Sequence, residues 1–244
     1  MKKLFSYLFT PIFLPVFGLL LVVFDPVQRL MYWVGDQKWQ QKVVVFLNLL
    51  LTRSLLLMGI HCKFRNEQSL PTDRPLIIVS NHQSMFDIPP FFWYLRKHSV
   101  KFVSKIELAK GIPSISFNLR KGGNAIIDRK DPDQAIPALT QFARYIEKNR
   151  FSACIFPEGT RSRTGHPKTF SLKGLATLLE HAPNALVVPV SINNCWKIMR
   201  HGWFPLSFGE KPTWRVHSPI EPAGKTAVDV LREVEQVIVA GIQI

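Results

Sequence analysis

The sequence predicts an α/β fold: a mixed, largely parallel central sheet flanked by helices, preceded by two apolar helices. From about residue 61 onward, short β-like runs alternate with helical patterns, as in layered α/β domains. Before that point, apolar residues are concentrated in two long runs. A chain of 244 residues with 47% apolar composition can bury a full core. We therefore expect residues 1–60 to form the apolar helices and residues 61–244 to form one catalytic domain.

The first apolar run, residues 4–24, carries no charged side chain. As a helix it would be roughly 30 Å long, about the thickness of the hydrocarbon core of a bilayer. The run ends at Val22–Pro26 without the small residues that a signal-peptide cleavage site needs, so we expect it to be retained as a membrane anchor. Pro11 and Pro15 are expected to bend or break the helix.

The second apolar run, residues 43–60, is interrupted by Asn48, Thr52, Arg53 and Ser54 and is typical of an interfacial segment. A polar turn at residues 35–41 joins the two runs. Two arrangements remain open: the pair dips into one leaflet and returns, or both helices cross the bilayer as a hairpin. Lys2, Lys3 and the lysines of the turn give no clear asymmetry for the positive-inside rule.

Six candidate strands follow, each a short apolar run. They are residues 76–80, 100–103, 124–128, 152–156, 186–191 and 213–217. One helix begins at the cap Asp131 with Pro132 at its first position. Its predicted buried stripe is Ile136, Leu139, Phe142 and Ile146, and Pro137 should distort its opening turns. The last helix is capped by Thr226, with Val228, Leu231, Val234 and Ile238 as its predicted buried face.

The chain is strongly basic, with a formal charge of +14, which calls for an anionic partner. The apolar N-terminal part favours a membrane over nucleic acid, and no nucleic-acid-binding module is recognisable. The three cysteines, Cys62, Cys154 and Cys195, form no CxxC pair and suggest neither disulfides nor a zinc site. Cys154 and Cys195 are expected to be buried. These features favour the cytoplasmic face of a membrane, and no metal or cofactor is expected.

Polar clusters follow three of the predicted strands, at the edge where open α/β sheets bind ligands. In the first cluster, His82 and Asp87 are five residues apart, a spacing that separates them on a continuous helix. They can meet if His82 lies at a strand-to-helix corner and Asp87 lies in the first turns. Asp87 would then fix the imidazole tautomer, and His82 would act as the general base toward a hydroxyl.

The second cluster places Glu158, Gly159, Thr160 and Arg161 on one tight loop. Gly159 lets the backbone approach a ligand, and the guanidinium of Arg161 suits phosphate oxygens. Glu158 is expected to bind a substrate hydroxyl or to hold Arg161. Backbone N–H groups at the Gly159 turn are candidates for stabilising an oxyanion.

The run Asn81–Asp87, together with Phe156–Arg161, resembles the glycerolipid acyltransferases, in particular the bacterial 1-acylglycerol-3-phosphate acyltransferases. The resemblance continues at residues 105–108, 123–129 and 187–190 and covers about residues 60–220 in order. It implies that His82 and Asp87 form the catalytic dyad. It also implies that Lys105, Arg129 and Arg161 bind the acceptor phosphate, and that the two apolar helices are the family's membrane motif.

The implied reaction is transfer of an acyl group from acyl-CoA or acyl-carrier protein to a lysophospholipid, lysophosphatidic acid first, giving phosphatidic acid. An acyltransferase acting on another lyso-lipid, such as one that contains an amino acid, stays open as an alternative. In that case Arg129 and Arg161 would bind a carboxylate. A non-catalytic protein that binds anionic lipid would explain the charge and the anchor, but not the His82, Asp87 and Glu158 combination.

Residues 193–209 are rich in aromatic and basic side chains and match no motif of the resemblance. Two interpretations are open. The segment is ordinary core and rim packing, or it is a surface loop that lies in the headgroup region of a membrane, where Trp and Lys are favoured.

Overall fold

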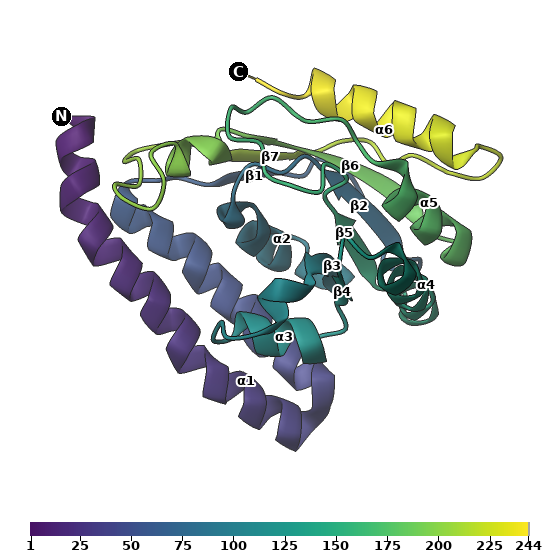
Figure 1. Ribbon diagram of the computed structural model, residues 1–244, viewed down its shortest axis with the longest axis horizontal. Helices are drawn as coiled ribbons and strands as arrows, with labels where there is room; N and C mark the ends of the chain where they lie inside the picture. The colour runs from purple at the N-terminus through teal and green to yellow at the C-terminus, as the bar shows by residue number, and fades with distance from the viewer. Residues whose placement is uncertain (244) are drawn as a thin grey trace.

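The computed structural model describes residues 1–243 and contains a seven-stranded sheet (Figure 1). The strands are β1 (Lys63–Arg65), β2 (Leu76–Ser80), β3 (Val100–Lys105), β4 (Ala125–Ile127), β5 (Ser152–Ile155), β6 (Leu186–Asn193) and β7 (Thr213–Val216). Their order is β1-β7-β6-β2-β5-β3-β4, and every neighbouring pair is parallel except β6–β7. The predicted mixed, largely parallel sheet is confirmed. Strand β1, with only one partly buried residue, was not predicted.

Helices cover both faces of this sheet. They are α1 (Lys2–Ser54), α2 (Ile88–Tyr94), α3 (Ile115–Lys121), α4 (Pro132–Asn149), α5 (Leu172–His181) and α6 (Ala227–Ala240). Alternate residues of β2 face opposite layers. Leu76 and Ile78 join the hydrophobic cluster under α1 and α2, whereas Ile77 and Val79 join the cluster under α4, α5 and α6. Because both faces are covered, the central strand reads as a continuous apolar run.

Helix α1 folds back on itself at Gly35 and Asp36, whose backbone angles are not helical (Figure 1). We call residues 2–34 its first arm and residues 37–54 its second arm. The Asp36 carboxylate accepts the N–H of Lys38 at 2.6 Å and so caps the second arm. Gly35 and Asp36 are the only non-helical positions inside α1, so of the bend or break predicted at Pro11 and Pro15, the break does not occur. Both prolines lie in the first arm, where the neighbouring Thr10, Phe13 and Phe17 are buried against the rest of the protein.

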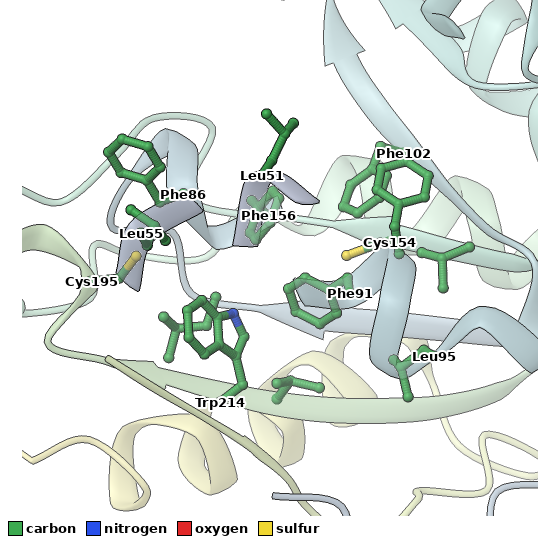
Figure 2. Close-up of a cluster of buried hydrophobic side chains, with 14 of the residues drawn as sticks. Leu51, Leu55, Phe86, Phe91, Leu95, Phe102, Cys154, Phe156, Cys195 and Trp214 are labelled. Atoms are coloured by element: carbon green, nitrogen blue, oxygen red, sulfur yellow. The ribbon is translucent and has the colours of Figure 1, made fainter. Parts of the chain in front are cut away.

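The second arm is more enclosed than the interfacial segment that we predicted. Val44, Leu47 and Leu51 are buried in the protein, and the polar Asn48 and Thr52 are buried with them. Each polar side chain bonds a carbonyl one turn back: Asn48 Nδ2 donates to Val44 O, and Thr52 Oγ1 donates to Asn48 O, both at 2.8 Å. These local hydrogen bonds allow polar residues to lie beneath the sheet. Figure 2 shows Leu51, and Leu55 just beyond this arm, among the aromatic side chains of the cluster.

Two predicted helix faces were placed partly wrongly. Ile136 on α4 and Val228 on α6 are each 48% exposed, and Ala143 and Val230 are buried in the faces that meet the sheet. In both helices the error falls in the first two turns. Pro137 lies inside α4, which runs from Pro132 to Asn149 with no interior residue outside the helical region.

Lys101 on β3 is buried, and its ammonium group donates to Gln41 Oε1 at 2.6 Å. Burial lowers the pKa of Lys101 from the usual 10.5 to about 8. The unfolded chain therefore binds a proton that the folded chain releases between these two values, so stability rises with pH across this window and is lost as the pH falls through about 8.

Replacing Lys101 with Met should stabilise the protein at pH 7. The gain is at most about 3 kcal/mol from the pKa difference, less about 1 kcal/mol for the lost hydrogen bond. Chemical denaturation of wild type and Lys101→Met at pH 7 and at pH 10.5 measures it. The advantage of the variant should disappear at the higher pH, and a difference independent of pH would contradict the argument.

Candidate active site

The site begins where β2 leaves the sheet. Asn81 is clamped to β6, since its Nδ2 donates to Ile192 O at 2.9 Å and its Oδ1 accepts the N–H of Ile192 at 2.7 Å. The next residue, His82, therefore leaves the sheet edge at a fixed point. Ser84 then caps the short 3₁₀ turn Met85–Asp87, which continues directly into α2. This is the strand-to-helix corner that the spacing of the motif predicts.

His82 and Asp87 meet across this corner. Nδ1 of His82 lies 2.7 Å from Oδ2 of Asp87, and the Asp87 side chain is fully buried, whereas that of His82 keeps 15% exposure. The same carboxylate oxygen accepts the N–H groups of Gln83 at 2.6 Å and Ser84 at 2.8 Å. A carboxylate only accepts hydrogen bonds, so Nδ1 carries the imidazole proton and Nε2 is free to accept another.

The loop after β5 holds His82 from three sides. The His82 backbone N–H donates to Glu158 Oε1 at 2.7 Å, and its carbonyl accepts the N–H of Ser162 at 2.8 Å. The imidazole stacks on the Phe156 ring, with centroids 4.2 Å apart and planes 17° apart. The two sequence clusters therefore form one site, as their positions at strand ends predicted.

Gln83 and Trp214 also position this corner, and sequence reasoning assigned them no role. Gln83 Oε1 accepts the N–H of Cys195 at 2.9 Å, and Gln83 Nε2 donates to Gly165 O at 3.3 Å. The indole N–H of Trp214, a fully buried residue of β7, donates to the backbone carbonyl of Asp87 at 3.1 Å. The position of Gln83 inside the first motif was a signal from which its role could have been predicted. The contact of Trp214 joins positions 127 residues apart, and no local pattern predicts it.

The Glu158 carboxylate accepts hydrogen bonds from the backbone. Its second oxygen, Oε2, accepts the N–H of Lys168 at 2.8 Å, so both carboxylate oxygens bond main-chain donors. Among residues 1–243, no ion pair joins Glu158 to Arg161. The Gly159 N–H donates to Phe156 O at 3.0 Å, which closes the turn and occupies the amide that we considered for an oxyanion. Gly159 has φ +68°, in the left-handed region that favours glycine.

Three basic side chains lie around the same sheet edge. Lys105 ends β3 opposite Ile127 of β4, and Arg129 follows two residues later. A Cβ atom on Gly159 would lie 3.8 Å from Nη1 of Arg129, which places that guanidinium beside the Glu158 loop. Arg161 and Thr160 project from the loop and are exposed. The structure thus brings Arg129 to the turn that carries Glu158, Thr160 and Arg161, with Lys105 on the neighbouring strand.

Burial shifts the pKa values of several groups near the site. It raises the pKa of Glu158, although the N–H donors of Lys168 and His82 oppose this effect. Burial first, and then the nearby Asp87 charge, raise the pKa of the Cys154 and Cys195 thiols well above their usual value. Both cysteines are fully buried, as predicted, and stay protonated. Local desolvation lowers the pKa of the exposed Arg129, and Glu107 partly offsets this, so the guanidinium remains charged at neutral pH.

The family model described as acyltransferase matches residues 61–193. The 1-acyl-sn-glycerol-3-phosphate acyltransferase of Saccharomyces cerevisiae is 30% identical over 146 residues, which cover 57% of this chain and 45% of that protein. The chloroplastic 1-acyl-sn-glycerol-3-phosphate acyltransferase LPAT1 of Arabidopsis thaliana is 35% identical over 136 residues, which cover 55% of this chain and 36% of that protein. The chain thus spans less than half the length of these relatives.

A solved structure shares the fold over nearly the whole chain. It is the crystal structure of the 1-acyl-sn-glycerophosphate (LPA) acyltransferase PlsC from Thermotoga maritima, with a TM-score of 0.81. The match covers 99% of this chain and 96% of that one, at 23% sequence identity. The likeness therefore includes the N-terminal helical hairpin as well as the sheet.

Proposed function

The chain belongs to the acyltransferase family, and on that premise we propose that it transfers a fatty acyl group from acyl-CoA or acyl-carrier protein to the free hydroxyl of lysophosphatidic acid, giving phosphatidic acid. The observation that carries the proposal is the His82–Asp87 contact of 2.7 Å beside a loop and sheet edge rich in basic side chains. The named relatives act on an acceptor of this kind. We propose His82 and Asp87 as the catalytic pair, and Lys105, Arg129, Gly159, Thr160 and Arg161 as the acceptor-binding group, with Glu158 beside them holding His82 in place.

In the proposed mechanism, Nε2 of His82 takes the proton from the acceptor hydroxyl as its oxygen attacks the thioester carbonyl carbon. Asp87 keeps the imidazole oriented and stabilises its positive charge. The tetrahedral intermediate then collapses, the carbon–sulfur bond breaks, and the thiolate leaves with the proton held by His82. The new ester and the free thiol account for all atoms, and the proposal requires no metal or cofactor.

The proposed location is the inner membrane, with the site on its cytoplasmic face. Within the described residues, the stretch Lys2–Met58 is long and apolar enough to cross a bilayer, and only 17% of its most apolar window is buried. The three cysteines are unpaired, which suits a reducing compartment. Such a position would place the acceptor phosphate at the bilayer surface beside the basic edge of the sheet.

The proposal is tested with purified full-length protein, a panel of lyso-lipids and both donor types. We expect phosphatidic acid to form from lysophosphatidic acid faster than the corresponding product forms from uncharged or amino-acid-containing lyso-lipids. A preference for an amino-acid-containing acceptor would support the alternative reaction. No transfer to any acceptor, in a protein that is folded and membrane-bound, would contradict the proposal.

Replacing Arg161 or Arg129 with Ala should weaken use of the acceptor. A charge-assisted contact contributes about 1.5–3 kcal/mol, and exposure favours the lower end, so we expect the KM for lysophosphatidic acid to rise about tenfold for each variant. Arg163→Ala, which removes an exposed charge two residues further along the loop, is the matched control. A rise confined to the KM for the acyl donor would show that these arginines bind the donor.

Glu158 can act by contacting the acceptor or by holding His82, and kinetics separate the two roles. Because both of its oxygens bond the backbone, we expect Glu158→Ala to displace His82 and to lower kcat about 10²-fold with little change in the acceptor KM. Glu158→Gln keeps one acceptor oxygen but turns an NH₂ group toward a backbone donor. Its kcat should therefore lie between that of the wild type and that of Glu158→Ala. A raised acceptor KM with unchanged kcat would instead support direct substrate contact.

A further inference from the structure

A pocket of about 500 Å³ lies between the first two turns of α1 and residues 200–210, which follow β6. Figure 1 shows the start of α1 beside this loop, at the edge of the molecule where β7 and β1 lie. Neither His82 nor any residue of the proposed acceptor-binding group lines it. The catalytic corner meets α1 further along, where Phe13 and Phe17 pack on Phe86. At 1.5 Å per helical residue, roughly 10–15 Å of helix separates the two places.

The pocket walls are fixed by contacts between distant parts of the chain. The backbone N–H of Phe208 donates to Ser6 Oγ, and that of Leu206 donates to Thr10 Oγ1, both at 3.0 Å. The rings of Phe5 and Phe208 lie 5.2 Å apart, and those of Tyr7 and Phe204 lie 5.6 Å apart. The segment rich in aromatic and basic residues is therefore attached to the N-terminal helix. It forms one surface with that helix.

This surface combines basic and apolar side chains. Lys2, Lys3, Arg200 and His201 line the pocket, where the one acidic side chain, Glu210, pairs with Arg200. Within residues 1–243, Lys2 and Lys3 form no ion pair. The exposed apolar side chains nearby are Leu4, at 70%, and the pair Trp203 and Phe204, at 58% and 54%. Unpaired lysines next to exposed aromatic side chains suit the level of a bilayer where phosphates meet acyl chains.

We propose that this pocket binds the phosphodiester headgroup of an anionic membrane lipid, as a docking site separate from the catalytic site. Lys2 and Lys3 supply the charge that attracts the phosphate, and Tyr7, Phe204 and Phe208 supply walls for the glycerol and the first part of the acyl chains. The exposed apolar face of the first arm, including Leu8 and Ile12, continues from the pocket along the helix and would lie against the same lipid. A soluble phosphate ester would leave these apolar side chains without a partner, so the occupant is a lipid within a bilayer.

The test measures binding of the full-length protein to phosphatidylcholine vesicles with and without phosphatidylglycerol, in the absence of any acyl donor. The Lys2→Gln, Lys3→Gln double variant should bind the phosphatidylglycerol vesicles roughly 30-fold more weakly and the phosphatidylcholine vesicles unchanged. The matched control is Arg144→Gln, Lys148→Gln, which removes the same charge from the exposed side of α4 and should leave both affinities unchanged. Equal losses of affinity in the two double variants would mean that only net charge matters and would contradict the proposed site.

A second pair of variants tests the pocket without changing charge. Phe204→Ala removes a wall and should reduce the preference for phosphatidylglycerol over phosphatidylcholine. Ile12→Ala, which removes an apolar side chain 48% exposed on the same arm but outside the pocket, should weaken binding to both vesicles alike. An unchanged preference in Phe204→Ala would overturn the proposal. These are binding measurements, so their outcome is independent of whether the protein transfers acyl groups.

Discussion

Replacing His82 with Ala is expected to lower acyl transfer by roughly 10²–10⁴-fold, the range that general-base catalysis contributes. The loss should appear in kcat, because no other group is proposed to take the hydroxyl proton. Replacing Asp87 with Asn should have an effect of similar order, since the amide no longer fixes the proton on Nδ1 of His82 or balances an imidazolium. Initial rates with lysophosphatidic acid and acyl-CoA, at saturating concentrations of both, measure the change.

The choice of Asn for Asp87 follows from the structure. Oδ2 of Asp87 also accepts the N–H groups of Gln83 and Ser84, so Asp87→Ala would leave buried donors unpaired and would destabilise the corner by about 0.5–2 kcal/mol or more. His61→Ala, at an exposed histidine, is the control for general effects of losing an imidazole. A His82→Ala protein with a normal melting temperature and near-normal turnover would exclude His82 as the base.

Local patterns were enough to predict the corner at which His82 and Asp87 meet. The prediction rested on the buried strand that ends at Ser80 and on the five-residue spacing of His82 and Asp87, which are near one another in sequence. The Ser84 cap that the structure shows is likewise a short-range contact. The same holds for the sheet, because strands buried on both faces are continuous apolar runs. The partners of this corner were not predictable in the same way. Trp214 reaches Asp87 from β7, and that contact depends on the antiparallel pairing of β6 and β7.

The contacts of α1 with the rest of the protein were also not predictable from local sequence. Its first arm is apolar throughout, so composition predicted a membrane helix but could not separate the residues that face lipid from those that face protein. In the structure, Phe13 and Phe17 are buried against Phe86 of the His82–Asp87 corner, whereas Leu8 and Leu19 are exposed. The second arm carries polar residues that suggested a segment at the membrane interface, yet the sheet covers this arm.

Deleting residues 1–60 is expected to prevent folding as well as membrane attachment. Nine apolar side chains before residue 61 are buried in the cluster that also contains residues of β2, β5 and β6. They are Phe13, Phe17, Leu21, Val44, Leu47, Leu51, Leu55, Met58 and Ile60. At about 1.5–3 kcal/mol for each, their loss is comparable to or larger than the whole net stability of a typical domain, about 5–15 kcal/mol. Activity should therefore disappear on bilayer acceptor and on a water-soluble short-chain acceptor alike.

Point variants separate the contribution of α1 to the fold from its contribution to membrane attachment. Phe13→Ala, at a fully buried site, should cost about 3–5 kcal/mol of stability and reduce activity on both acceptors to the same degree. The triple variant Leu8→Ser, Ile12→Ser, Leu19→Ser changes side chains that are 48–61% exposed, so it should keep the melting temperature in detergent and lose activity mainly on the bilayer acceptor. The measurements are thermal unfolding and turnover on the two acceptors. If the chain without residues 1–60 unfolds cooperatively and still acylates the short-chain acceptor, the anchor is separable and its buried face is dispensable for the fold.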